Sequence, residues 1–177
     1  MLDDVFVFYR YQQGIKLLED AEMANDAEEE DQKHLLLKLL LNRAQCLIKI
    51  HWPKKACINL QRALELDEGN PKALYRLGKA KRMLGNLDDA RRFLIKAQRA
   101  APDDTSIGNE LASLDRQITR DRNNEKALYQ RMLGGEQDRP PPRRDNDNVG
   151  DNKVQDEFLE EVFEQLEGKI QGNGFYF

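Results

Sequence analysis

Residues 71–104 read PKALYRLGKAKRMLGNLDDARRFLIKAQRAAPDD and repeat the pattern of residues 37–70, which read LKLLLNRAQCLIKIHWPKKACINLQRALELDEGN. The two stretches align without a gap at a constant shift of 34 residues. Each has two runs of helical apolar spacing, separated by a short turn at 51–53 in the first copy and at 84–86 in the second. Pro102 closes the second copy. The alignment predicts two consecutive helical hairpins.

Small residues recur where the two helices of each hairpin would cross. Ala44 aligns with Gly78, and Ala56 aligns with Ala90. Small side chains at a crossing let the backbones approach, and leucines around the crossing fill the remaining space. A 34-residue helix-turn-helix unit with this alternation resembles the tetratricopeptide repeat. The resemblance implies an all-α fold, a tetratricopeptide-repeat helical hairpin stack (α-solenoid) with a long C-terminal capping helix.

The rest of the chain divides around these two repeats. Residues 1–36 are interpreted as the second helix of a partial first repeat, followed by an acidic connection at 24–31 and a helix beginning near Gln32. Val5–Phe8 has high β-propensity, which argues against a helix at that point. Downstream we expect the following segments: a capping helix at 105–133, a flexible linker at 134–152, an amphipathic helix at 153–171 and a flexible end at 172–177.

The 153–171 segment carries an apolar stripe that a lone helix cannot bury. The stripe contains Val154, Phe158, Val162, Leu166 and Ile170, and five glutamates lie on the other face. We expect this helix to pack on the repeats of its own chain or of a second copy. The alternative is a linear motif that enters a helix-binding groove of an outside partner.

Charge is distributed unevenly along the 177 residues, whose formal net charge is −4. Residues 1–32 hold 10 acids and 2 bases, residues 33–133 hold 21 bases and 11 acids, and residues 134–177 hold 11 acids and 5 bases. The basic middle suits an anionic partner, the acidic ends of the chain itself, or simple solvation. No apolar run approaches the length of a membrane span, and no signal peptide is evident, which predicts a cytoplasmic protein without membrane contact.

Residues that could support enzyme chemistry are sparse. His34 and His51 have no partners at ligand spacing, so no metal is expected. Cys46 and Cys57 fall in the two helices of one hairpin and are expected to pack as small apolar residues. No catalytic motif appears, and we expect neither catalytic residues nor a cofactor. The arginines of the 105–133 helix alternate with acids and lack stacking aromatics, which makes direct nucleic-acid binding an unfavourable interpretation.

The candidate site consists of Asn42, Lys72 and Arg76, on the first helices of the two repeats. Lys72 and Arg76 are one helical turn apart and share a face, while Asn42 is the position equivalent to Arg76 one repeat earlier. Two cations and an amide donor facing one groove suit a peptide carboxylate, with Lys79 in support. Solvation of Lys72 at a helix start is the alternative explanation.

Several stretches resemble the tetratricopeptide domain of the large FK506-binding immunophilins: 41–46, 63–67 and 72–76. The stretches 90–98 and 125–132 resemble the germline, Shutdown-like branch of that family. The resemblance implies a carboxylate clamp for the C-terminal Glu-Glu-Val-Asp of Hsp90, and by the same chemistry Hsp70, with Asn42, Lys72 and Arg76 at three clamp positions. It also implies a role with Piwi-type proteins in the small-RNA (piRNA) silencing of transposons.

In that family the other two clamp positions lie on the first helix of the first repeat, and an isomerase domain precedes the repeats. This sequence contains neither that helix nor that domain. Three functions therefore stay open: a non-enzymatic Hsp90 co-chaperone adaptor, a scaffold that reads an internal peptide of another partner, and part of a peptidyl-prolyl isomerase whose catalytic domain lies outside this chain.

Overall fold

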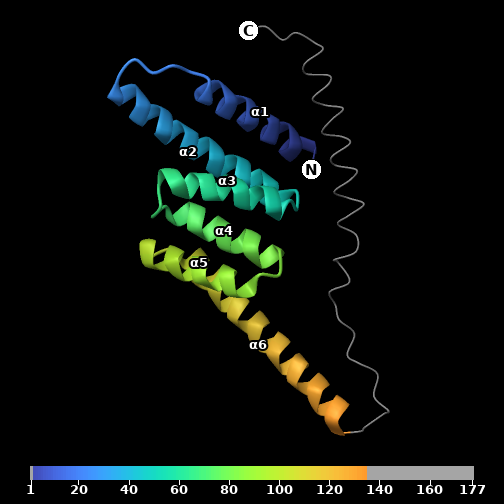
Figure 1. The fold of residues 1–177 in the computed structure, drawn as a ribbon. Coiled ribbons are helices and arrows are strands. Elements are labelled where there is room, and N and C mark those ends of the chain that lie inside the picture. The colour runs from blue at the N-terminus through green and yellow to red at the C-terminus, as the bar shows by residue number, and fades with distance from the viewer. Residues whose placement is uncertain (1, 135–177) are drawn as a thin grey trace. The chain divides into compact units, whose positions relative to one another are not determined.

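Six α-helices account for the secondary structure that the computed structural model describes, which covers residues 2–134 (Figure 1). This part of the chain is all-α, as the sequence analysis predicted. The helices are α1 (Leu2–Glu19), α2 (Asp26–Lys49), α3 (Pro53–Leu66), α4 (Pro71–Met83), α5 (Leu87–Ala100) and α6 (Thr105–Gly134). Of the predicted linker at 134–152 the structure describes only Gly134, which ends α6, and the predicted segments at 153–171 and 172–177 lie outside the described residues.

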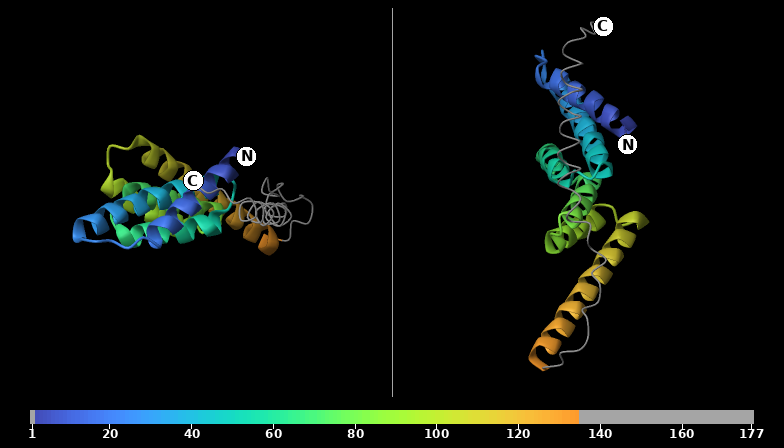
Figure 2. Two further views of the ribbon diagram at one scale, coloured as in Figure 1. Left: turned by 90° about the horizontal axis from the view of Figure 1, so that it is seen from above. Right: turned by 90° about the vertical axis from the view of Figure 1, so that its right-hand side faces the viewer.

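The helices α2 to α5 form the two predicted hairpins, and α1 packs beside α2 (Figures 1 and 2). Within the hairpins α2 contacts α3 and α4 contacts α5, while α3 and α2 both contact α4. The turn at 84–86 lies between α4 and α5, where Gly85 has φ +77°. That left-handed conformation suits glycine, which has no Cβ to clash. In the first hairpin His51 takes this role with φ 61°.

Side chains at the helix crossings follow the small and large alternation of the repeat. Ala44, Ala56 and Ala90 are fully buried, and the leucines at 40, 60 and 94 are fully buried beside them. Gly78 of α4 lies so close to α5 that an added Cβ would be 2.7 Å from Leu94 Cγ and 3.3 Å from the carbonyl oxygen of Ala90. The close approach of the two helices therefore depends on the missing side chain.

The helix α2 begins earlier than the sequence analysis placed it. The acidic run at 26–31 forms its first turns, and Asn25 caps them by accepting a hydrogen bond from the Glu28 amide at 2.9 Å. Glu28 reaches back to the amide of Ala24 at 2.9 Å, and acids in a first turn favour the helix dipole. Gln32, the expected start, is already inside the helix.

The β-propensity of Val5–Phe8 is overridden by packing. The segment lies inside α1, and the Phe8 ring is buried on the α2 side. The Arg43 guanidinium of α2 lies 4.8 Å from the centroid of that ring. Burial of an aromatic ring against a neighbouring helix outweighs the weak local preference of these residues for a strand.

The first part of α6 covers the outer side of the second hairpin. Ile107 packs in a cluster with Leu74 and Ala97, and Leu114 packs in another with Ala90 and Leu94. Residues up to 127 form one compact unit. Within 2–134, no helix is long and apolar enough to cross a bilayer.

A glycine-to-alanine pair tests the hairpin crossing. Alanine normally stabilises a helix interior by about 1 kcal/mol over glycine. We expect Gly78→Ala to lower the melting temperature instead, because its Cβ would overlap Leu94. Gly108→Ala in α6 is the matched control, since its Cβ would meet nothing closer than 3.9 Å, and it should raise the melting temperature. A stabilised Gly78→Ala protein would contradict the close crossing.

Candidate site on the α2 and α4 face

The candidate residues lie on two helices that contact each other: Asn42 on α2, and Lys72 and Arg76 on α4. Arg76 of α4 donates a hydrogen bond from Nη1 to the carbonyl oxygen of Leu41 in α2, at 2.7 Å. Leu41 is directly before Asn42 in the sequence, so the guanidinium is held at the level of Asn42 along α2. Lys72 lies one turn before Arg76 on the same face of α4. The Leu41 contact fixes the level of the Arg76 guanidinium along α2, and the grouping of the three residues in one site stays a prediction.

The position of Lys72 follows from the start of α4. Asn70 caps the helix by accepting from the amide of Ala73 at 3.0 Å, and Pro71 occupies the first helical position. Proline there loses no backbone hydrogen bond and has the φ angle that a helix needs. Lys72 is therefore in the first turn, and its side chain is exposed.

The three candidate side chains differ in how much of their polar surface is already used. Arg76 is half-buried, and this burial lowers the pKa of its guanidinium from the usual value, although arginine stays protonated. One of its five N–H donors is engaged by Leu41. Within residues 2–134, no hydrogen bond or ion pair engages the exposed side chains of Asn42 and Lys72. Donors for a carboxylate are therefore available at all three positions.

Lys79, the expected supporting residue, is half-buried on α4 one turn beyond Arg76. Its ammonium has no ion pair within the described part of the chain. The position of Lys79 adds positive charge near Arg76, and its role in a site stays a prediction.

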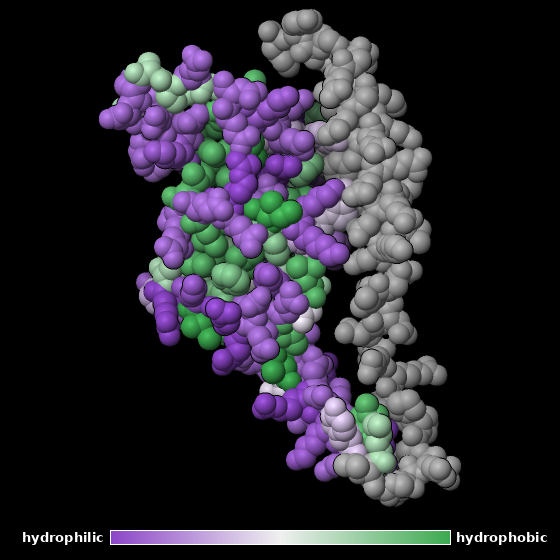
Figure 3. All heavy atoms as spheres, viewed as in Figure 1, coloured by the Kyte–Doolittle hydropathy of each residue, from purple (hydrophilic) through white to green (hydrophobic). Residues whose placement is uncertain are grey.

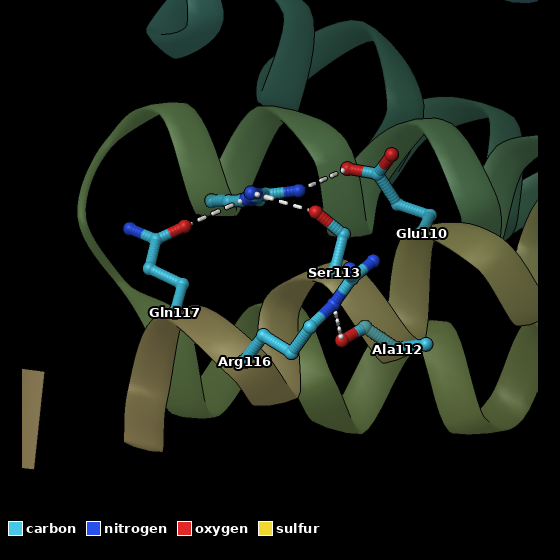
Figure 4. A network of polar contacts seen from close by, with 6 residues as sticks. Glu110, Ala112, Ser113, Arg116 and Gln117 are labelled. Atoms are coloured by element: carbon cyan, nitrogen blue, oxygen red, sulfur yellow. Dashed lines mark hydrogen bonds and ion pairs between the residues drawn. The ribbon is translucent and has the colours of Figure 1, made fainter. Parts of the chain in front are cut away.

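A second arginine of α4, Arg82, donates hydrogen bonds to α6 from all three of its nitrogens. Its guanidinium donates to Gln117 Oε1 at 2.9 Å, to Glu110 Oε1 at 2.9 Å and to the Ser113 hydroxyl at 3.3 Å (Figure 4). The three acceptors come from one face of α6. A partly buried ion pair with two further hydrogen bonds fixes α6 against α4 more firmly than a surface pair would.

Sequence reasoning did not identify the Arg82 network. Its partners are 28 to 35 residues away in the sequence, so no local motif includes them. The available signal was the spacing of 110, 113 and 117, which places three polar residues on one side of a helix.

Other basic residues of the middle region also have internal partners. Arg43 donates to Gln12 Oε1 at 3.3 Å, and burial together with the positive charge of Arg62 lowers its pKa. Arg62 pairs with Glu19, and Arg91 pairs with Asp115 at 2.8 Å. These cations join neighbouring helices. The excess of bases in 33–133 is therefore partly a structural feature, because several of these cations join one helix to another.

The two cysteines are buried, as the sequence analysis expected, and His34 is on the surface. Cys46 and Cys57 are both buried and unbonded, and burial raises the pKa of each thiol, which disfavours the reactive thiolate. His34 is exposed and lies 3.6 Å from Glu30. Over residues 2–134, no group of three or more His, Cys, Asp or Glu side chains could hold a metal ion.

Alanine substitutions of Arg76 and Lys72 should differ in their effect on the melting temperature. Arg76→Ala removes a part-buried, charge-assisted hydrogen bond and should destabilise the fold by about 1–3 kcal/mol, which lowers the melting temperature by several degrees. Lys72→Ala removes an exposed side chain and should leave the melting temperature unchanged. The measurement is circular dichroism on heating. Equal melting temperatures for the two variants would show that the Leu41 contact contributes nothing.

The chain is similar in sequence and in structure to known proteins. A tetratricopeptide-repeat family model matches residues 58–114. The Arabidopsis thaliana peptidyl-prolyl cis-trans isomerase FKBP42 is 47% identical over 92 residues, which are 52% of this chain and 23% of that protein. The Drosophila melanogaster inactive peptidyl-prolyl cis-trans isomerase shutdown is 34% identical over 112 residues, 62% of this chain and 25% of that protein.

A solved structure agrees with these sequence relatives. It is the C-terminal TPR-containing domain of an FK506-binding protein from Plasmodium falciparum, with a TM-score of 0.62 and 26% identity over 68% of this chain and 81% of that one. The chain contains a tetratricopeptide-repeat domain with the all-helical fold that the 34-residue repeat predicted. Its homologues are FK506-binding-type immunophilins, and it spans about a quarter of the two curated relatives described above.

Proposed function

We propose that this tetratricopeptide-repeat domain, a homologue of those in FK506-binding immunophilins, is an adaptor that captures an acidic C-terminal peptide on its α2 and α4 face. One observation carries the proposal. Arg76 is pinned to α2 by Leu41 and keeps spare donors, beside the exposed and unengaged ammonium of Lys72. The function is protein–protein recognition without chemistry of its own.

The arrangement suits a terminal carboxylate because each donor can supply a different part of the recognition. Lys72 provides a compact positive charge, and Arg76 provides planar N–H donors whose direction the Leu41 hydrogen bond restricts. The Asn42 amide can donate to the same group from α2. A guanidinium that is already oriented loses less side-chain entropy on binding than a mobile one.

The partner that best matches this chemistry is the Glu-Glu-Val-Asp terminus of Hsp90 or Hsp70. The support is the agreement of Asn42, Lys72 and Arg76 with the clamp pattern that the immunophilin resemblance implies. The Shutdown-like resemblance of the stretches 90–98 and 125–132 extends the proposal to Piwi-pathway proteins, and the similarity to the Drosophila protein named shutdown supports that resemblance.

The two other functions make different demands on the chain. A scaffold that reads an internal peptide would not need a free carboxylate at the ligand terminus. An isomerase function would need a catalytic domain in addition to these repeats, and the match to the isomerase relative covers 23% of that protein. The relative named as inactive favours adaptor work over catalysis.

Titration calorimetry with a peptide ending in Glu-Glu-Val-Asp tests the proposal. Lys72→Ala should weaken binding by about 1–3 kcal/mol, the range for hydrogen bonds to charged groups, without changing stability. Added salt should weaken wild-type binding, because the contact is ionic. The affinity itself should be modest, in the tens of micromolar, since only three clamp positions are present.

Two controls make the result specific. Lys54→Ala removes an equally exposed lysine from α3 and should bind as the wild type does. The peptide with a C-terminal amide should lose most of its affinity. If the amide binds as well as the acid, the internal-peptide scaffold is the better description, and if Lys72→Ala binds like the wild type, the proposed site is wrong.

A further inference from the structure

The C-terminal half of α6 carries an apolar surface that the repeats do not use. Ile118 packs against the cluster of Ala90, Leu94 and Leu114, and residues 119–130 beyond it are all exposed. Leu128, Tyr129 and Met132 are 41%, 57% and 71% exposed and lie on one side of the helix. A small apolar group is visible near this end of α6 (Figure 3). Exposed apolar groups of this kind mark docking surfaces.

The low intrinsic stability of the C-terminal half of α6 indicates that a partner packs against it. A helical segment of about four turns is marginal in water when only its own hydrogen bonds support it. Here the segment also contains Asn123 and Asn124, which are weak helix formers. A partner that buries Leu128, Tyr129 and Met132 would supply the missing stabilisation.

We propose that the occupant is the chain's own segment 153–170, which forms an antiparallel helical hairpin with the C-terminal half of α6. The segment has an apolar residue at 154, 158, 162, 166 and 170, widened by Leu159 and Phe163. This is the pattern of a helix that buries one face against a neighbour.

Charge complementarity favours this pairing over docking elsewhere. Residues 116–131 contain five bases and two acids, whereas residues 153–170 contain six acids and two bases. Exposed apolar side chains also occur on α1, at Phe6 and Leu17, and at isolated positions of α2, α3 and α4. Those of α1 belong to the region 1–32, which holds 10 acids and 2 bases and would repel an acidic helix. Electrostatics therefore favours α6 over α1.

The connecting chain has a suitable length for an intramolecular hairpin. Residues 135–152 number 18, and a flexible chain of this length spans about 25 Å on average, more than the 8–10 Å between two packed helix axes. The two helical stretches match in length, since 17 or 18 residues extend about 26 Å. The tether keeps the segment at an effective concentration near millimolar, which favours the same chain over a second copy.

Hydrogen exchange on the full chain tests this pairing, which does not involve Asn42, Lys72 or Arg76. Met132→Asp places a charge in the apolar surface and should make amides of 153–170 exchange about tenfold faster or more. Gln130→Asp is the matched control, because it adds the same charge to an exposed position on the opposite side of α6 and should leave 153–170 protected. Residues 71–100 should be unaffected by either variant.

The reciprocal pair of variants and the oligomeric state complete the test. Phe158→Ser should speed exchange in 119–134, and Phe175→Ser, the same substitution outside the stripe, should not. Sedimentation should show a monomer of 20.6 kDa. Three results would overturn the proposal: exchange of 153–170 at free-peptide rates in the wild-type chain, protection that appears only with a concentration-dependent dimer, or equal effects of Met132→Asp and Gln130→Asp.

Discussion

The contact on which the rest of the structure depends is the crossing of α4 and α5, where Gly78 lies against Leu94 and the backbone of Ala90. This contact sets how closely the two helices approach. Leu94 also belongs to the cluster that receives Leu114 of α6, and Leu74 belongs to the cluster that receives Ile107. A wider crossing would displace both clusters, and with them the packing of α6.

The same crossing controls the direction in which α4 presents its polar residues. With Gly78 toward α5, Arg82 faces α6 and reaches Glu110, Ser113 and Gln117, while Arg76 faces α2 and reaches Leu41. One helix thus uses one arginine to hold the next repeat layer and another to hold the preceding one. Arg82 donates a hydrogen bond from each of its three nitrogens, whereas Arg76 donates one. Arg76 therefore has more N–H groups left to donate to a ligand.

Charged side chains in this domain serve its assembly. The pairs Arg62–Glu19 and Arg91–Asp115 join helices that are neighbours in the stack, and the Arg43 guanidinium lies on the Phe8 ring. A positive segment charge would, by itself, indicate nucleic acid or any acidic partner. Several of these cations have partners inside the domain, so the charge of the segment does not by itself identify a nucleic-acid interface.

Sequence alone determined the helical hairpins and their register, because the 34-residue shift aligns small residues with small and leucine with leucine at each crossing, and packing constraints of this kind are local in the repeat. It also identified Asn42, Lys72 and Arg76 as a possible set, since equivalent positions of successive repeats lie on neighbouring helices. It misplaced the start of α2, because the acidic run at 26–31 looks like a connection until the Asn25 cap and its bond to Glu28 are seen. Only the tertiary structure decided which cations are engaged. The partners of Arg76 and Arg82 are 28 to 35 residues away, and their pairing depends on side-chain direction and on the distance between packed helices, which no local pattern specifies.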